Sequence, residues 1–228
     1  MENIKKHLMQ LPLGICAGAS IGLGGLCFAA ITFALPNIYG KVLGSLAFSI
    51  GLFLVCTFYF SLYTGKVGIA IENKGPKGAV LDLAIMLLGN LGGAIGFGYL
   101  MYVFFHNTDM FSRFTEIASS RSKDFVGHPT FEMYLTTFLA AFFCGLCVYL
   151  AVKCFAKRRL QPLGILELVF FVFTFVYCGF EHCIANMFYF SEANAWSWNA
   201  VINIVIVVIG NSLGTLPGIA LWKMAGDK

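Results

Sequence analysis

Long apolar stretches alternate with short polar ones along the whole chain. A transmembrane helix needs about 20 apolar residues in a row, and six stretches reach that length. They cover residues 8–33, 42–71, 78–105, 131–155, 163–190 and 200–222. Short breaks separate them, except for one longer polar connection at residues 106–130. The pattern predicts an all-α integral membrane protein with six transmembrane helices.

The composition agrees with a membrane protein and excludes an ordinary soluble domain. Of 228 residues, 59% are hydrophobic and 11% are charged, whereas soluble domains carry roughly 25% charged residues. A soluble fold of this length has too little interior to hide so much apolar surface. The first apolar stretch does not end in a small-residue cleavage site, so we expect no cleavable signal peptide.

The distribution of positive residues predicts the orientation, because loops on the cytoplasmic side carry more lysine and arginine. With a cytoplasmic N-terminus, ten positive residues lie inside and four outside. The inside residues are Lys5, Lys6, Lys74, Lys77, Lys153, Lys157, Arg158, Arg159, Lys223 and Lys228. The outside residues are Lys41, Arg113, Arg121 and Lys123. We therefore expect a multi-pass protein of the cell membrane with both termini in the cytoplasm.

The two halves of the chain resemble each other. Gly89-Asn90 in the third stretch and Gly210-Asn211 in the sixth are 121 positions apart. Three spans per half make this an inverted repeat, with halves of about 1–105 and 131–228 in a single transmembrane domain. Chance similarity between glycine-rich helices is the alternative, since glycine recurs at helix contacts.

Polar residues interrupt the second and fifth stretches at equivalent places. The second contains Thr64-Gly65-Lys66 and the fifth contains Glu181-His182. Irregular backbone inside a membrane is tolerated where it lines a cavity or is buried in protein. Spans two and five are therefore predicted to be broken by pore loops.

Ionisable groups within a membrane mark function by default. His182 is the predicted pore residue, because imidazole can carry or lend a proton near neutral pH. Glu181, Asn186, Asn90 and Asn211 are expected to satisfy the exposed backbone groups of the broken segments. The alternative is a buried His–Glu pair that only fastens helices together.

Two further features have two interpretations each. Lys66 either gives the first loop a positive charge or extends its amine to the membrane surface, and the sequence leaves both open. Cys144 and Cys147 have the spacing of a redox or metal motif, but no histidine lies near them. Buried cysteines in such a helix are expected to pack as small apolar residues. We expect no metal and no cofactor.

Residues 179–188 closely resemble a segment typical of the formate/nitrite transporter family. Residues 62–65 are similar to that family's other pore loop, and residues 47–52 to the helix that leads into it. The resemblance implies an aquaporin-like fold of six spans and a homopentamer with a pore in each protomer. It implies transport of a small monovalent anion such as formate, nitrite or hydrosulfide, and no enzymatic activity or nucleic-acid partner.

The resemblance also assigns pore residues. Phe48, Leu52, Leu62 and Phe175 match hydrophobic constrictions, Thr64 matches a pore-loop threonine and His182 the central histidine. The family usually has a lysine near the start of span four, and residues 127–132 contain none. His128 is the nearest basic residue there, and Lys66 is the other candidate for the missing charge. The short tails and the lysine-bearing loop favour a hydrosulfide-type member.

The mechanism and two rival functions stay open at this point. The anion either crosses as a charged species or takes a proton from His182 and crosses neutral. A neutral-solute aquaporin-like channel requires two Asn-Pro-Ala loops, which the sequence lacks. A membrane redox protein requires a cluster of metal ligands, and only His182 among the four histidines lies deep in a span.

Overall fold

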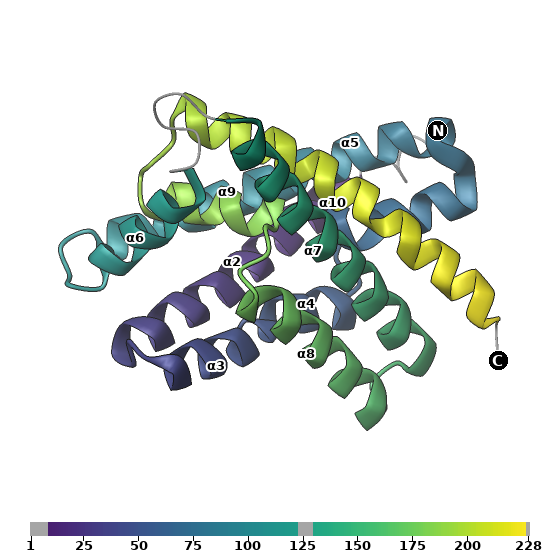
Figure 1. Ribbon diagram of the computed structural model, residues 1–228, viewed down its shortest axis with the longest axis horizontal. Helices are drawn as coiled ribbons and strands as arrows, with labels where there is room; N and C mark the ends of the chain where they lie inside the picture. The colour runs from purple at the N-terminus through teal and green to yellow at the C-terminus, as the bar shows by residue number, and fades with distance from the viewer. Residues whose placement is uncertain (1–8, 123–129, 227–228) are drawn as a thin grey trace.

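The computed structural model describes residues 9–122 and 130–226, and every regular element in these ranges is a helix (Figure 1). In chain order the helices are α2 (Gln10–Ala34), α3 (Ile38–Ala47), α4 (Ser49–Thr57), α5 (Tyr63–Phe105), α6 (Phe111–Ser122), α7 (Phe131–Arg158), α8 (Pro162–Tyr177), α9 (Cys183–Glu192) and α10 (Trp198–Ala225). The all-α class predicted from the apolar pattern is confirmed for these residues.

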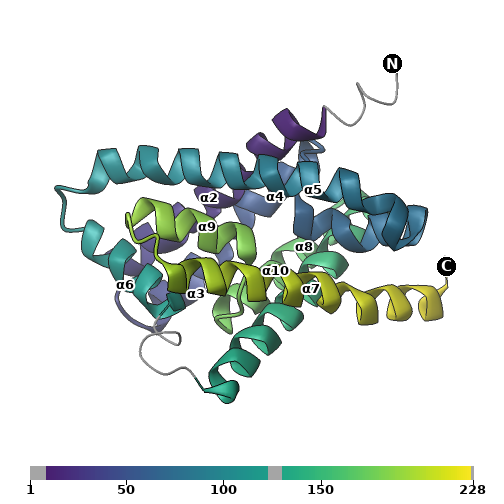
Figure 2. The same ribbon diagram turned by 90° about the horizontal axis from the view of Figure 1, so that it is seen from above.

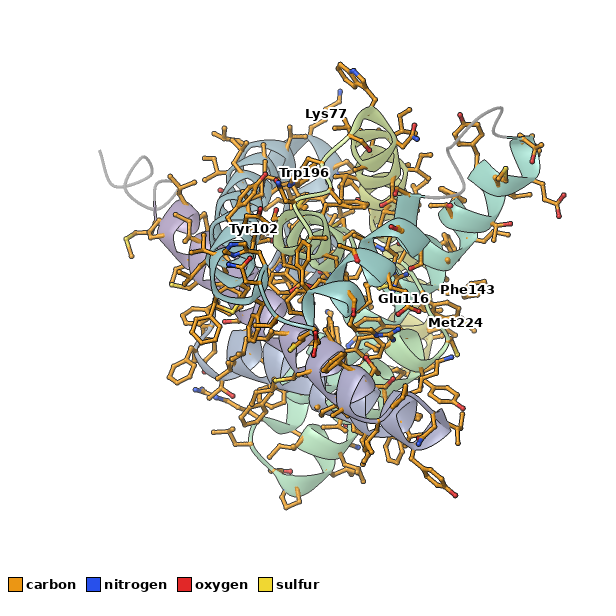
Figure 3. The ribbon with its side chains drawn as sticks, turned by 90° about the vertical axis from the view of Figure 1, so that its left-hand side faces the viewer. Lys77, Tyr102, Glu116, Phe143, Trp196 and Met224 are labelled. Carbon is orange, nitrogen blue, oxygen red and sulfur yellow. The ribbon has the colours of Figure 1, made fainter. Side chains whose placement is uncertain are left out.

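Five of the helical stretches are long and apolar enough to cross a membrane, with α3 and α4 counted together. Helix α8, with 16 residues, is apolar but shorter. Large apolar side chains such as those of Phe104 and Phe143 are exposed on the outside of the bundle, and Phe143 lies at its edge in Figure 3. An apolar exterior of this kind requires an apolar solvent, so the chain is a multi-pass membrane protein.

Local sequence signals place several helix ends. Asn37 begins α3, and its side chain accepts hydrogen bonds from the backbone N–H groups of Tyr39 and Gly40, as N-cap residues do. Gly75 has a positive φ of 68° and precedes Pro76, so α5 is two helices joined at a kink. The predicted break between the second and third apolar stretches lies at this kink.

The polar connection at residues 106–130 contains a helix that the apolar pattern did not predict. Helix α6 turns Phe114, Ile117 and Ala118 towards the bundle, where they are buried. It packs against α9, α10 and α2. Short amphipathic helices of this kind fall below the length of an apolar span, so the search for long apolar stretches missed it.

Two helix pairs form the frame of the bundle, α2 with α5 and α7 with α10. Glycines allow the backbones of each pair to touch. A β-carbon on Gly93 would collide with the backbone carbonyl of Ile15 in the first pair, and one on Gly214 with that of Phe142 in the second. Small residues at helix contacts are the usual means of close approach in membranes.

The bundle has two distinct ends. Helix α10 ends at one end of the bundle, on the right in Figures 1 and 2, and α6 lies at the opposite end. We call these ends the terminal side and the α6 side. The turn between α7 and α8 also lies on the terminal side (Figure 1).

Gly93→Ala is expected to destabilise the protein by about 1–3 kcal/mol, because the new methyl group meets backbone and α2 must move away. Gly96→Ala is the matched control in the same helix, since nothing lies within 4 Å of its β-carbon position. It should be neutral or slightly stabilising, because alanine favours a helix. Thermal unfolding of the purified variants measures both. Equal unfolding temperatures would contradict the close contact between α2 and α5.

Candidate functional site

Two breaks in helices meet in the middle of the bundle. The first, at residues 58–62, separates α4 from α5, and the second, at residues 178–182, separates α8 from α9. Thr64 lies in the first turn of α5, and His182 is the N-cap of α9. Their side chains share a hydrogen bond of 2.9 Å between Oγ1 and Nε2, and both residues are buried. The two helix N-termini therefore face each other across this bond.

Asn90 of α5 holds the first break together. Its Oδ1 accepts the backbone N–H of Tyr63 at 2.7 Å. Its Nδ2 donates to the carbonyl of Ser61 at 2.7 Å and to that of Gly14 at 3.0 Å. One carboxamide thus satisfies backbone groups on both sides of the break and joins it to α2.

Asn211 of α10 does the same for the second break. Its Oδ1 accepts the backbone N–H of Cys183 at 3.0 Å. Its Nδ2 donates to the carbonyl of Glu181 and to that of Ala141 in α7, both at 2.8 Å. The two asparagines, 121 positions apart, make equivalent sets of bonds.

The contacts of His182 indicate where its proton lies. Nδ1 accepts the backbone N–H of Ala185 at 3.2 Å, so its lone pair is occupied. The ring proton of the neutral form is therefore assigned to Nε2, which faces Thr64. The ring also stacks on Phe175, with centroids 5.8 Å apart. A proton on Nδ1 would break the cap of α9.

Apolar side chains surround this polar pair. Phe48, at the junction of α3 and α4, meets Phe175 of α8 edge to face, with ring centroids 5.8 Å apart. Leu52 and Leu62 are also buried, at 2% and 1% exposure. Phe48 and Phe175 line a cavity on the α6 side, and Leu62 lines another on the terminal side.

The cavity on the α6 side is small, about 20 Å³, and Arg121 enters it from the end of α6. The Arg121 guanidinium forms an ion pair with Glu181, with 2.6 Å between Nη1 and Oε1, and donates to the Gly179 carbonyl at 3.3 Å. His182 lines the same cavity. Nε of Arg121 is buried and has no hydrogen-bond partner among the described residues. One charged donor is therefore unused beside the cavity.

A closed set of side chains fixes this arginine. Glu181 accepts a second hydrogen bond from Nδ2 of Asn186, which also donates to Asn203 at 2.9 Å. Asn203 in turn donates to the backbone carbonyl of Arg121 at 3.0 Å. The expectation that Glu181 and Asn186 satisfy backbone groups is wrong for their side chains, which bind other side chains.

The cavity on the terminal side is larger, about 280 Å³, and two cations line it. Lys66 of α5 donates from Nζ to Oγ of Ser61 at 3.1 Å, and Ser61 donates to Gln10 at 2.6 Å. Arg159 lies beyond the end of α7, with its guanidinium 4.4 Å from the centroid of the Tyr59 ring. Lys66 therefore lies on the side of the Thr64–His182 bond away from Arg121.

Arg121 and Arg159 are the residues that the sequence analysis missed. Arg121 was counted only as a positive charge in an outside connection, and His128, the basic residue suggested in place of the missing lysine, lies outside the described residues. One signal was available, because an acid within a span requires a cationic partner. Nothing in the linear order identified which arginine would supply it.

No group of three or more His, Cys, Asp or Glu residues is placed to hold a metal ion within residues 9–122 and 130–226. Cys144 is buried and Cys147 half-buried, and both are free thiols. The arrangement around His182 is therefore one of hydrogen-bond donors, two cavities and apolar side chains. It can hold a small anion by hydrogen bonding, and it can exchange a proton through the imidazole.

The family model described as "Formate/nitrite transporter" matches residues 2–224. The chain is 31% identical to the "Uncharacterized transporter YrhG" of Bacillus subtilis (strain 168), over 94% of this chain and 84% of that protein. It is 26% identical to "Formate channel FocA" of Escherichia coli (strain K12), over 96% of this chain and 87% of the channel.

Two solved structures resemble this chain over almost its whole length. A "Pentameric formate channel with formate bound" superimposes with a TM-score of 0.81 at 26% identity, covering 97% of this chain and 98% of that one. An "FNT family ion channel" superimposes with a TM-score of 0.80 at 21% identity, covering 98% and 91%. The second match, at its lower identity, shows the shared fold.

Arg121→Gln is expected to destabilise the protein by about 2–3 kcal/mol, because it leaves the carboxylate of Glu181 largely buried without its cation. The double variant Arg121→Gln/Glu181→Gln should recover most of that loss, since no unpaired charge remains. Arg113→Gln is the control, because its partner Glu116 is 66% exposed and such pairs contribute about 1 kcal/mol or less. Thermal unfolding measures all three. A single variant that unfolds like the double variant would contradict the ion pair.

Proposed function

Because the chain belongs to the formate/nitrite transporter family, we propose that it forms a membrane pore for small monovalent anions such as formate, nitrite or hydrosulfide. The family consists of channels and transporters and is not a family of enzymes. One observation carries the proposal. The polar pair Thr64 and His182 lies between two cavities that each have a cationic side chain in their walls.

Positive groups along the proposed pore offset the hydration that an anion loses on entering it. A bare anion that leaves water for an apolar constriction loses several kcal/mol of hydration. In the proposed pore, Lys66 and Arg159 attract it at the terminal side, and Nε of Arg121 binds it at the α6 side. Between them, the N-termini of α5 and α9 supply positive potential, because each helix start carries about half a positive charge.

The apolar side chains set the size of what passes. We assign Phe48 and Phe175 to a constriction on the α6 side of His182, and Leu52 and Leu62 to one on the terminal side. All four side chains are buried and Phe175 stacks on His182, so an anion must shed water to pass them. Asn90 and Asn211 keep the two breaks rigid enough to hold these positions.

In this proposal, Arg121 supplies the positive charge that a lysine near the start of span four usually supplies in the family. It reaches the cavity from α6 rather than from α7, and it keeps one buried donor free for an anion. Glu181 balances its charge, and Asn186 and Asn203 fix its position. An arginine also keeps its proton in a buried site where a lysine can lose it.

We further propose that His182 lends a proton to weakly basic anions. The donor in this step is the imidazolium, because neutral imidazole is far too weak an acid to protonate these anions. The ring would first take up a proton from the solvent at Nδ1, which releases the backbone N–H of Ala185, and Nε2–H would then transfer its proton to an anion between the two cavities. Formate, nitrite or hydrosulfide would pass the constrictions as a neutral acid and leave a neutral ring with its proton on Nδ1. Uptake of a proton at Nε2 and loss of the Nδ1 proton would restore the bonds to Thr64 and Ala185.

Membership of the family also suggests a membrane topology and an oligomeric state. We propose six membrane passages, in which α8 and α9 together make the fifth and the breaks at 58–62 and 178–182 form the pore loops. The equivalent bonds of Asn90 and Asn211 support an inverted repeat. The named pentameric relative supports a homopentamer, and the excess of Lys and Arg on the terminal side supports cytoplasmic termini.

Anion flux into liposomes tests the function. The wild type should carry formate, nitrite and hydrosulfide and should not carry glycerol, which a neutral-solute channel would pass. Arg121→Gln/Glu181→Gln removes the charged donor but leaves no unpaired charge, so it should raise the half-saturating formate concentration about tenfold, as loss of one charge-assisted hydrogen bond does.

The control for that variant is Arg158→Gln/Glu167→Gln, a second Arg–Glu pair on the terminal side that lines neither cavity. Its flux should match the wild type. Glycerol flux without formate flux in the wild type would overturn the proposed function. Formate flux with the same half-saturation in both double variants would remove Arg121 from the pore.

His182→Gln should flatten the dependence of formate flux on pH between about pH 5 and pH 8. Imidazole is the only side chain whose ordinary titration falls there, and glutamine can hold a hydrogen bond without exchanging a proton. His106→Gln is the control, because His106 is exposed at the end of α5 and its Nδ1 hydrogen-bonds carbonyls of its own helix. Superimposable profiles for wild type and His182→Gln would end the proton-transfer proposal.

Nitrate flux distinguishes proton transfer by His182 from an effect of the histidine charge on the anion. It takes no proton near neutral pH, so a proton lent by His182 affects formate flux and leaves nitrate flux unchanged. An equal effect of His182→Gln on both anions would show that the histidine acts as a charge in the pore and transfers no proton.

A further inference from the structure

The small cavity on the α6 side has two unused polar atoms of opposite character in its walls. Nε of Arg121 is a hydrogen-bond donor and Oδ1 of Asn186 is an acceptor, and neither has a partner among the described residues. Both residues line the cavity, and Asn186 is 1% exposed. Because a buried polar atom without a partner costs free energy, the two atoms fit an occupant that accepts one hydrogen bond and donates another.

The surrounding hydrogen bonds determine which end of the Asn186 amide is free. Its Nδ2 donates to Oε2 of Glu181 and, at 2.9 Å, to Oδ1 of Asn203. Asn203 uses its own Nδ2 to donate to the backbone carbonyl of Arg121 at 3.0 Å. Both partners of Asn186 are therefore acceptors, so its NH₂ group must face them and its oxygen is the unpaired atom.

Tyr189 adds a third free polar group to the cavity. It lies three residues after Asn186, on the same face of α9, and it lines the cavity at 3% exposure. Its ring lies against Gly25 of α2, where a β-carbon would come within 3.2 Å of Cε1. The hydroxyl makes no hydrogen bond within the described part of the chain. It can donate or accept, so it supplies a second donor beside Nε of Arg121.

The size of the cavity limits the occupant. About 20 Å³ holds one molecule of about the size of water, and Phe28, Phe48 and Phe175 form apolar parts of the wall. Formate and nitrite have three non-hydrogen atoms each, whereas hydrosulfide and chloride have one. Chloride only accepts hydrogen bonds, but hydrosulfide accepts them at its charged sulfur and donates one from S–H. Hydrosulfide therefore matches both the size and the polar groups of the cavity.

We infer, on the basis of the proposed function, that this cavity selects hydrosulfide among small monovalent anions. Nε–H of Arg121 and the Tyr189 hydroxyl donate to the sulfur, and S–H donates to Oδ1 of Asn186. Chloride, formate or nitrite uses the same donors but leaves Oδ1 unpaired beside a negative charge, which weakens its binding. Glu181 does not line the cavity, and its two oxygens are engaged by Arg121 and Asn186.

Inhibition of formate uptake into liposomes tests the selection. Uptake of labelled formate is measured at fixed pH with increasing hydrosulfide or chloride. Chloride has the charge and about the size of hydrosulfide but carries no proton, so the comparison isolates the bond to Asn186. Because formate is the species measured, hydrogen sulfide that crosses the lipid by itself does not affect the readout. Hydrosulfide should inhibit the wild type at about one tenth of the chloride concentration, as one buried hydrogen bond predicts.

Two variants separate the roles of the polar groups. Asn186→Ala removes the acceptor, so hydrosulfide should lose its advantage of about tenfold over chloride. A role of Asn186 in holding Arg121 alone would weaken both inhibitors and keep their ratio. Tyr189→Phe removes a donor that both anions use, so it should weaken both about fivefold and keep the ratio. Tyr99→Phe is the control, because Tyr99 of α5 lines neither cavity of the proposed pore, and it should change neither value.

The outcomes distinguish this site from the proposed function. Formate uptake that hydrosulfide and chloride inhibit equally in the wild type would overturn the selection and leave the anion pore intact. An unchanged ratio in Asn186→Ala would also overturn it. If Asn186→Ala fails to fold, the wild-type ratio and Tyr189→Phe still decide the question. Absence of formate uptake by the wild type would overturn the proposed function, and the selection with it.

Discussion

A helix that breaks inside a bilayer exposes backbone N–H and C=O groups that lipid cannot hydrogen-bond, and each unsatisfied group costs several kcal/mol. At each of the two breaks in this chain, the carboxamide of one asparagine binds the exposed backbone groups. Asn90 and Asn211 each accept the N–H at the start of a half-helix and donate to the carbonyl before it. An aspartate lacks the donors and a serine lacks the reach and the second donor. The third bond of each asparagine ties its break to the neighbouring helix, at Gly14 or at Ala141.

This constraint determines the electrostatics at the centre of the molecule. Because both breaks end in helix N-termini that face each other, two partial positive charges approach across the bond between Thr64 and His182. The N-cap bond to Ala185 holds the His182 ring in the orientation that directs Nε2 towards Thr64. Positive potential is thus present at the centre without a full charge, which burial among Phe48 and Phe175 would penalise.

Local signals made most of the fold predictable, and remote contacts did not. Apolar length identified the long helices, and Asn37 and Gly75-Pro76 marked boundaries that depend on a few neighbouring residues. Helix α6 was missed because its apolar face is short and its sequence is polar overall. The partner of Glu181 was missed for a deeper reason. Arg121 is 60 positions away in sequence, and only the packing of α6 against α9 and α10 brings the two together.

In the candidate site, too, local features were predictable from the sequence and contacts between distant residues were not. The polar residues at the two breaks were identified because polar groups inside a span are conspicuous, whereas their partners were not. Lys66 points towards the terminal side, where it binds Ser61 and lines the larger cavity. Neither the bond nor the cavity can be recognised in the sequence. The side chains of Glu181 and Asn186 bind each other and the residues around them because α6 supplies a cation that the linear sequence does not connect with them.

The two ends of the proposed pore attract an anion by different physical means. On the α6 side, Glu181 neutralises Arg121, so the pair has little long-range field and acts through its buried, unpartnered hydrogen-bond donor Nε. On the terminal side, neither Lys66 nor Arg159 has an ion-pair partner among the described residues. Their field therefore extends into the solvent and is screened over about 8 Å at physiological salt. Capture at the terminal side thus weakens as salt rises, whereas binding at Arg121 depends on contact geometry and changes little. A pore with one long-range and one short-range site is asymmetric even though its two helix breaks are held in the same way.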